Sequence, residues 1–329
     1  MSVYLHGFGH FHPETEITNA FLEGLDIGTS DAWIMDRVGI RTRRTVLSLD
    51  YLRHTKNADP RAASEASAYN HAELGARAAR MALERARLTP ADIGLVISGT
   101  SSPELVSPAE ACAIAARLGI EAPAFDVTSA CTSFFAPLYL MSMMDPARLP
   151  AFVLIVTPET LTCTADYRDR SSAVLWGDAA TAAVISTREP GRAEIVGSML
   201  GSHPAAFDKV VIPRHGFFRQ DGQSVQKFAI KSMTAMVKNL KASHSVPGRR
   251  WGFVGHQANL RMLESVCHSS DIAADRHFHN VTDFGNTAAA GSPSVLSMHW
   301  DEFRPNDDLA VAGVGAGLTS ASYLLRFLH

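Results

Sequence analysis

The sequence predicts an α/β protein made of two related halves, and three observations support this. Apolar, strand-like segments alternate with amphipathic, helix-like segments from residue 70 to residue 186. A charged turn at 187–192 then marks the midpoint of the chain. Beyond it the alternation resumes, and in both halves a reactive side chain follows a strand. We therefore expect an N-terminal unit over residues 1–187 and a C-terminal unit over 188–329, each with a mostly parallel sheet.

Periodicity and turn residues place the individual elements. In the first half we expect strands at 3–8, 92–102, 125–127, 151–156 and 173–186, and helices at 17–25, from Ser30 or Asp31 to Gly39, at 70–86, at 108–118 and after Cys131. In the second half we expect strands at 193–200, 250–256 and a final one at 308–314, helices at 225–243, from 258 and within 283–296, and a hairpin about Asp221-Gly222. The polar segment 45–68, with its Asp59-Pro60 breaker, predicts an irregular insertion or lid.

Composition excludes several classes of protein. The chain has 329 residues, is 46% hydrophobic and 19% charged, and carries a net charge of −3. It therefore buries a large core and has no general attraction for nucleic acid or an anionic membrane. Its four cysteines show no CxxC spacing, which argues against a zinc site or a disulfide framework. We find no membrane-length apolar run and no signal-like start, and we expect a cytoplasmic protein without a metal.

The stretch from Phe125 to Met144 holds the strongest candidate for a reactive residue. A short apolar-to-acidic run leads through small residues to Cys131, and an apolar segment follows. This order predicts a strand, a tight turn and a helix whose first turn carries the thiol. Free N–H groups and the helix dipole at such a position favour the thiolate. Because free cysteines are often core residues, an inert buried thiol is the alternative interpretation.

Two later segments supply partners for the thiol. GHQANLR (255–261) places His256 at a strand end, and GNTAAAGSP (285–293) places Asn286 before small residues that enter a helix. Taken singly, His256 fits a core histidine, and Asn286 fits a turn residue or helix cap. Together with Cys131 they form a set that is far more specific than any one member.

The motifs along the chain resemble those of the β-ketoacyl-acyl-carrier-protein synthase III family of the thiolase superfamily. They are the opening HPE…TN, SDAWI…RVGIR…R, DVTSACTSF, DRSSAVLWGDAATAAV, HQANLR, FGNTAAA and the closing VGAGLTSA. The resemblance implies a thiolase fold, with two pseudo-repeated βαβαβ halves in five αβαβα layers. It also implies a homodimeric condensing enzyme that takes acyl groups from CoA or acyl carrier protein and needs no cofactor.

The resemblance also implies roles for single residues. Cys131 would hold the acyl group as a thioester, and the N–H groups of Cys131 and Ala316 would form an oxyanion hole. His256 and Asn286 would donate to the carbonyl of the second substrate. The positions that match CoA contacts are Trp33, Arg37 and Arg170, and those that match carrier-protein docking are Lys227 and Arg261. Without the resemblance, the basic edge around Trp33 fits a solvated surface equally well.

Several residues depart from the family pattern. CTSF replaces the commoner CAGF, and Pro137 is expected to kink the following helix. Ser107 stands where a bulky Phe often closes the acyl tunnel of the other subunit, which should leave room for a longer chain. The insertion 49–64 resembles specialised members that join two acyl chains, including α-pyrone-forming ketosynthases of the myxopyronin and corallopyronin kind. Glu104 is either a base contributed across the dimer or an ordinary surface carboxylate.

The sequence thus predicts a condensing enzyme of polyketide or other specialised metabolism, in which Cys131 is acylated before a Claisen-type C–C bond forms. One alternative keeps the fold but moves the acyl group to a hydroxyl or an amine, with His256 as general base. Another alternative is a non-catalytic subunit that only binds acyl carriers. The complete set of Cys131, His256 and Asn286 argues against the second alternative, and the presence of Asn286 argues against the first.

Overall fold

The structure is a computed structural model that describes residues 2–214 and 216–328. Its largest sheet has ten strands. The N-terminal five are β1 (Val3–Phe11), β4 (Ile93–Ser98), β5 (Ala124–Asp126), β6 (Phe152–Thr160) and β7 (Asp178–Ser186). The C-terminal five are β8 (Ala193–Gly201), β11 (Arg250–Gly255), β12 (His277–Phe278), β13 (Asp307–Gly315) and β14 (Thr319–Phe327). They hydrogen-bond in the order β12-β11-β13-β14-β8-β1-β7-β6-β4-β5.

The two sets of five strands have the same topology. In the first set β4 pairs in parallel with β5 and β6, and β7 runs antiparallel between β6 and β1. In the second set β11 pairs in parallel with β12 and β13, and β14 runs antiparallel between β13 and β8. Only a short antiparallel pairing of β1 with β8, through Val3, Tyr4 and Leu5, joins the two sets. The pseudo-repeat predicted from the sequence is confirmed.

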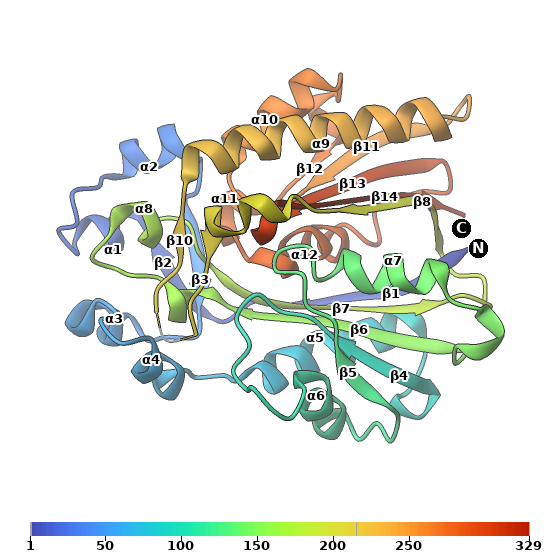
Figure 1. Cartoon of the computed structure of the whole chain (residues 1–329), viewed down its shortest axis with the longest axis horizontal. Coiled ribbons are helices and arrows are strands. Elements are labelled where there is room, and N and C mark those ends of the chain that lie inside the picture. Colours follow the sequence, from blue (N-terminus) through green and yellow to red (C-terminus); the bar gives the residue numbers. More distant parts are fainter. Residues whose placement is uncertain (1, 215, 329) are drawn as a thin grey trace.

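Helices separate and cover the two sets of strands. They are α5 (His71–Ala86) and α6 (Glu110–Leu118), α7 (Phe135–Met143) and α12 (Gly291–Met298), and α9 (Gly222–His244) and α10 (Leu260–Ser269). Figure 1 shows α5 and α6 on one outer face, α9 and α10 on the other, and α7 and α12 in the central layer. The expected five-layered αβαβα arrangement is therefore present. Three apolar clusters fill the spaces between the layers.

Smaller elements surround the ends of the strands. They are β2 (Thr15–Thr18), β3 (Thr42–Thr45), β9 (Val210–Val211) and β10 (Arg219–Gln220), with helices α1 (Asn19–Glu23), α2 (Asp31–Arg37), α3 (Leu49–Thr55), α4 (Pro60–Ala66), α8 (Arg170–Ala173) and α11 (Val281–Phe284). The 3-10 turns are η1 (Pro90–Asp92), η2 (Pro146–Arg148), η3 (Leu161–Thr164), η4 (Pro204–Lys209), η5 (Ala274–Arg276), η6 (Ala288–Ala290) and η7 (Ala316–Leu318). Within the described ranges, no helix combines the length and the apolar character that a bilayer crossing needs.

The segment 45–68 is more regular than its polarity suggested, and the expectation of an irregular segment was wrong. Its helices α3 and α4 begin at side-chain caps, because Ser48 and Asp59 accept hydrogen bonds from backbone N–H groups two or three residues on. One face of each helix is buried through Leu52 and Ala63. Between the helices, the buried Asn57 carboxamide donates to the carbonyls of the loop after β6. Capping and a few buried contacts, rather than strong periodicity, order this segment.

Four other local predictions were wrong. The last strand is β14 rather than the segment 308–314, because GAGLTSASYLLRF continues into an antiparallel partner of β13. Residues 15–18 form a strand before α1. Asp221 caps α9, so the hairpin turn lies earlier, between β9 and β10. Pro137 is the third residue of α7, so its missing N–H falls in the first turn rather than inside the helix.

Candidate active site

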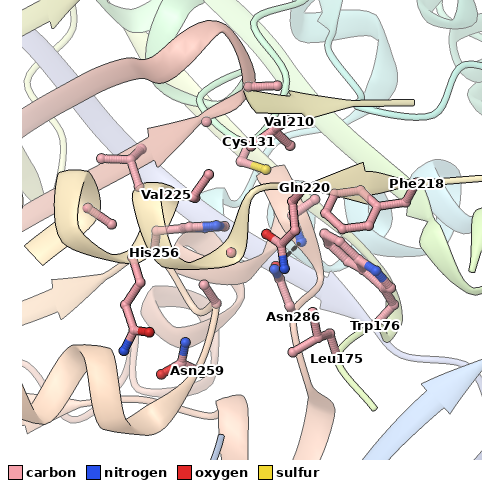
Figure 2. Close-up of a pocket in the computed structure, with 18 of the residues that line it drawn as sticks. Cys131, Leu175, Trp176, Val210, Phe218, Gln220, Val225, His256, Asn259 and Asn286 are labelled. Atoms are coloured by element: carbon pink, nitrogen blue, oxygen red, sulfur yellow. Dashed lines mark hydrogen bonds between the residues drawn. The ribbon is translucent and has the colours of Figure 1, made fainter. Parts of the chain in front are cut away.

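A cavity of about 520 Å³ lies where the parallel strands of both halves end. Cys131 follows β5, His256 follows β11 and Asn286 follows α11, and all three side chains line this cavity. Figure 2 shows the sulfur, the imidazole and the carboxamide facing the same space. Residues more than 150 positions apart therefore meet at one place, as the sequence predicted. No carboxylate lines the cavity within the part of the chain that the structure describes.

A turn of small polar residues presents Cys131. The Thr132 hydroxyl donates to the carbonyl of Ser129 (2.7 Å), and the Ser133 hydroxyl donates to that of Ala130 (2.7 Å). Ala130 itself has a φ of +47°, a left-handed conformation that costs about 1 kcal/mol or more for a non-glycine residue. Since α7 begins only at Phe135, Cys131 precedes the helix instead of lying in its first turn, and that expectation was wrong. The hydrogen-bonded turn, rather than the helix, aims the thiol.

The protonation state of Cys131 also differs from the sequence-based expectation. Burial raises the pKa of the Cys131 thiol to about 12, and the nearby Glu159 carboxylate contributes to the rise. The neighbouring Ser101 hydroxyl opposes this shift only in part. Because α7 starts four residues later, its dipole does not act on the sulfur from within the first turn. The Cys131 thiol is therefore neutral near neutral pH, and any reaction at the sulfur requires that its proton be removed.

His256 is held at the end of β11 as a neutral base or donor. Its backbone N–H donates to the carbonyl of Ala312 on the neighbouring strand β13 (2.9 Å), which extends the parallel pairing by one residue. The side chain is buried, and this burial alone lowers the pKa of His256 to about 4. The imidazole is therefore uncharged near neutral pH and carries one N–H that can donate to a carbonyl oxygen.

The backbone and the side-chain oxygen of Asn286 are both fixed. Its N–H donates to the carbonyl of Leu175 (2.8 Å), and its carbonyl accepts from the N–H of Gly177 (3.1 Å). The carboxamide oxygen accepts from the backbone N–H of Ala288 (2.9 Å). This contact assigns the oxygen of the amide and leaves its NH₂ group for the cavity. Asn286 is therefore a preorganised hydrogen-bond donor.

The end of β13 closes one side of the site, where Ala316 lines the cavity. Gly315 approaches the thiol-bearing turn so closely that a Cβ there would lie 3.1 Å from the backbone nitrogen of Cys131. A side chain at this position would push the two backbones apart. Cys131 and Ala316 thus lie on adjoining segments, which is the placement that an oxyanion hole built from their N–H groups requires.

Aromatic and cationic side chains stack at the predicted CoA position. Trp33 and Arg37 line the cavity, and the Arg170 guanidinium lies 4.8 Å from the centre of the Trp33 ring. Arg37 lies over the same ring at 5.9 Å. Arg170 also donates to the carbonyl of Gly28 (2.6 Å), which fixes its orientation. The three residues form one unit, and its two guanidinium groups suit phosphate.

The other predicted residues lie outside the cavity of this chain. Lys227 is exposed on α9, and Arg261 on α10 donates to carbonyls at the end of α2, including that of Met35 (3.0 Å). Ser107 and Glu104 belong to the exposed loop 101–109. The Glu104 carboxylate accepts from the backbone N–H of His71 (3.0 Å). Their suggested roles across a dimer stay predictions.

Sequence reasoning missed the apolar wall of the cavity. The hairpin β9–β10 and the start of α9 supply much of it, and Trp176 packs edge-to-face on Phe218 with ring centres 4.5 Å apart. Other apolar residues of this wall are Leu161, Val174, Leu175, Val210, Val211, Ile212, Val225, Phe228 and Met262. A short apolar run at 210–212 was the available signal, but it gave no indication of which cavity it would line.

Side chains of the kinds that can ligate a metal come together at one place outside the cavity. Within the described residues, one group of three such side chains comes close enough to share an ion: His71, Glu104 and Glu110. These carboxylates already accept backbone N–H groups, and the group lies outside the residues that line the cavity. The cavity itself offers a thiol, an imidazole and amides, and these fit acyl chemistry without a metal.

Comparisons with known proteins agree with this geometry. Residues 125–204 match the family model of 3-oxoacyl-[acyl-carrier-protein] synthase III, and residues 251–327 match the model of its C-terminal part. The chain is 32% identical to the β-ketoacyl-[acyl-carrier-protein] synthase III of Sulfurovum sp. (strain NBC37-1), over 97% of this chain and 94% of that protein.

Two solved structures extend the likeness to the fold. The 3-oxoacyl-[acyl-carrier-protein] synthase III of Aquifex aeolicus VF5 superposes with a TM-score of 0.87 at 28% identity, covering 99% of this chain and 100% of that one. The priming β-ketosynthase of the R1128 polyketide biosynthetic pathway gives a TM-score of 0.85 at 25% identity, with coverages of 99% and 96%.

Proposed function

Because the chain belongs to the 3-oxoacyl-[acyl-carrier-protein] synthase III family of condensing enzymes, with the thiolase fold, we propose that it joins two thioester-bound acyl chains through an acyl-Cys131 intermediate. The observation that carries this proposal is the convergence of Cys131, His256 and Asn286 on one cavity with apolar walls and no carboxylate among its described lining residues. A thiol nucleophile next to two neutral donors suits chemistry at thioester carbonyls.

In the first half-reaction the Cys131 sulfur attacks the carbonyl of the donor thioester. The N–H groups of Cys131 and Ala316 stabilise the negative oxygen of the tetrahedral intermediate. The bond to the donor thiol then breaks, and the leaving thiol takes the proton that Cys131 gives up. This coupling matters because the raised pKa of Cys131 disfavours a free thiolate beforehand.

In the second half-reaction His256 and Asn286 donate to the carbonyl of the second thioester. Their hydrogen bonds stabilise the enolate that forms when the substrate loses CO₂ or an acidic α-proton. The α-carbon attacks the acyl-Cys131 carbonyl, a C–C bond forms, and the C–S bond to Cys131 breaks. The departing thiolate then takes up a proton, from solvent after loss of CO₂ or from the group that removed the α-proton. A neutral imidazole serves this step, since the lowered pKa of His256 keeps it uncharged near neutral pH.

The basic residues near Trp33 and on α9 and α10 support a proposal for the carriers of the two acyl groups. The stack of Trp33, Arg37 and Arg170 suits the nucleotide and phosphate of CoA or the phosphopantetheine of acyl carrier protein. Lys227 on α9 and Arg261 on α10 are exposed cations, which suit an acidic carrier protein. No further cofactor is needed, since the substrates bring their own activated thioesters.

The apolar wall that includes Trp176 and Phe218 suits a substantial acyl chain, and Ser107 of a second subunit, where the family often has an aromatic ring, would leave further room. We therefore place the reaction in polyketide or related specialised metabolism, where two acyl chains are joined and the product can cyclise to an α-pyrone. The likeness to the R1128 priming ketosynthase supports this placement. In this scheme Glu104 of a second subunit is the base that removes an acidic α-proton.

A homodimer is part of this proposal. The edge strand β5 leaves Phe125 46% exposed, and the nearby loop 101–109 leaves Val106 77% exposed. Asp126 on β5 accepts from the N–H groups at the start of α6, so this edge and that loop lie at the same end of the molecule. An exposed apolar strand edge normally pairs or is covered. A second copy of the chain meets that need and brings Ser107 and Glu104 toward the partner's cavity.

The test is acylation of the protein by a defined acyl-CoA, followed by intact mass. The Cys131→Ala variant should show no acyl adduct, whereas the native protein and a Cys112→Ser control, which lacks the exposed cysteine, should show one. Stable acylation of Cys131→Ala would exclude the assigned nucleophile. Product mass from two defined thioesters then distinguishes C–C bond formation from transfer to a hydroxyl or an amine.

A further inference from the structure

Glu159 is a fully buried carboxylate near the end of β6, just behind the lining of the cavity. Its oxygens accept hydrogen bonds from two separate turns. In the turn after β4, the backbone N–H of Ser101 (2.9 Å) and the hydroxyls of Thr100 (3.0 Å) and Ser102 (3.2 Å) donate to the carboxylate. On the other side, the backbone N–H of Ala289 donates (3.1 Å). One side chain thus joins the N-terminal half to the loop that carries Asn286.

Both turns form walls of the active site. Ser101 lines the cavity, and the adjoining Gly99 packs so tightly on the thiol-bearing turn that a Cβ there would lie 2.8 Å from the Ser133 side chain. Ala289 follows Ala288, whose N–H holds the carboxamide oxygen of Asn286. A shift of the Glu159 carboxylate would therefore move the surroundings of both Cys131 and Asn286.

The charges around Glu159 are few. Its hydrogen bonds come from neutral groups, and the cation that acts on it is His71 of α5. His71 in turn faces Glu104, Glu110 and Glu159, so it is shared among three carboxylates. Burial raises the pKa of Glu159 to about 7, and its charge is one cause of the raised pKa of Cys131. Near neutral pH this carboxylate titrates next to the nucleophile.

We propose that Glu159 is a positioning residue with two effects: it fixes the Ser101 and Ala289 turns, and its negative charge adds to burial in keeping the Cys131 thiol protonated between turnovers. The inference rests on the proposed role of Cys131 as nucleophile. A resting thiol reacts slowly with stray electrophiles and oxidants, whereas a bound thioester is attacked within the oriented site.

The variant Glu159→Gln separates the two effects. A glutamine oxygen can still accept from Ser101 and Ala289, and its NH₂ group can donate to the hydroxyls of Thr100 and Ser102, which rotate to accept. The variant therefore keeps the positioning contacts and removes the charge. Glu159→Ala removes both, and Glu159→Asp keeps the charge but shortens the reach.

The measurement is the rate of alkylation of Cys131 by iodoacetamide in a Cys112→Ser background, followed by intact mass from pH 5.5 to pH 9. At pH 8 we expect Glu159→Gln to react on the order of tenfold faster than the native protein, since one unit of thiol pKa changes the thiolate fraction tenfold. Below about pH 6 the two rates should converge, because Glu159 is then protonated in the native protein as well. Asp307→Asn removes a buried carboxylate that is paired with arginines in the C-terminal half and has no part in this network, so it should leave the rate unchanged.

Equal alkylation rates for Glu159→Gln and the native protein at pH 8 would overturn the electrostatic effect, and so would a ratio that does not depend on pH. Condensation should survive in Glu159→Gln to within tenfold and be lost in Glu159→Ala, and full activity of Glu159→Ala would overturn the positioning effect.

If the variants do not fold, the pH dependence of alkylation in the native protein tests the proposal. Its alkylation rate should rise less than tenfold per pH unit between 6 and 8, and an unbroken tenfold rise would contradict the proposal. Acylation of Cys131 is scored separately, so failure here leaves the proposed function intact.

Discussion

The two halves of the molecule share one topology but contribute opposite chemistry. In each half, three parallel strands end at the cavity: β4, β5 and β6 in the first, and β11, β12 and β13 in the second. Ser101 follows β4, Cys131 follows β5, and the buried carboxylate of Glu159 lies near the end of β6. After the second three come His256, Asn286 and Ala316. The N-terminal half thus supplies the proposed nucleophile and a buried carboxylate, and the C-terminal half supplies the proposed neutral donors.

The correspondence extends to backbone strain. Ala130 precedes Cys131 with a φ of +47°, and Ala288 follows Asn286 closely with a φ of +45°. Both lie before a central-layer helix, α7 in one half and α12 in the other. Left-handed non-glycine residues are held in place only by the surrounding packing. In each half, a left-handed alanine in the turn before a central-layer helix thus adjoins a side chain that lines the cavity.

The largest expected effect is a loss of condensation, without a loss of acylation, in variants of the C-terminal half. His256→Ala and Asn286→Ala should each lower condensation about 10²- to 10³-fold, the usual cost of losing one oxyanion donor, while acylation of Cys131 persists. Intact mass measures the acyl-enzyme, and product formation from a second thioester measures condensation. If His256→Ala lost acylation and kept condensation from preformed acyl-enzyme, the division between halves would be wrong. Unchanged activity of Asn286→Ala would favour acyl transfer to a hydroxyl or an amine.

The outer edges of the sheet differ as well. At the C-terminal edge, Phe278 on β12 packs edge-to-face on Phe303 and lies under the Arg276 guanidinium. At the N-terminal edge, Phe125 on β5 is half exposed. We expect Phe125→Glu to convert a dimer into monomers because it places a charge in the proposed interface.

Light scattering after gel filtration measures this change in mass. Met199→Glu is a matched control, since Met199 is an equally exposed apolar residue on β8, away from that edge. A native protein that is already monomeric, or a Phe125→Glu variant that stays dimeric, would contradict the proposed interface.

Local patterns in the sequence predicted most strands and helices and singled out Cys131, His256 and Asn286, because periodicity and small-residue turns act over a few positions. The family resemblance gave these three residues their joint role. What local patterns could not predict depends on contacts between distant segments. The raised pKa of Cys131 comes from burial and from Glu159, twenty-eight residues away in the sequence. The apolar wall depends on where the β9–β10 hairpin folds back over Trp176. The helices in 45–68 depend on two caps and on docking of Asn57.

The smallest expected effect concerns how each half buries its carboxylates. In the C-terminal half, the buried Asp307 and Asp308 are paired with arginines, as in the contacts of Arg276 with Asp307 (2.7 Å) and Arg326 with Asp308 (2.9 Å). In the N-terminal half, burial without an arginine raises the pKa of Glu159 to about 7 and that of Asp178 to about 6.

Such groups bind more protons in the folded state than in the unfolded state, so their contribution to stability falls as the pH rises from about 4 to about 7. Glu159→Gln removes one of them and should gain on the order of 1–3 kcal/mol in unfolding free energy at pH 8, with little change near pH 4.5. Urea unfolding at both pH values measures the difference. A variant that loses stability equally at both would mean that hydrogen bonding, rather than charge, dominates at this position. Burial of the Glu159 charge would then cost the N-terminal half no more unfolding free energy than the arginine-paired carboxylates cost the C-terminal half.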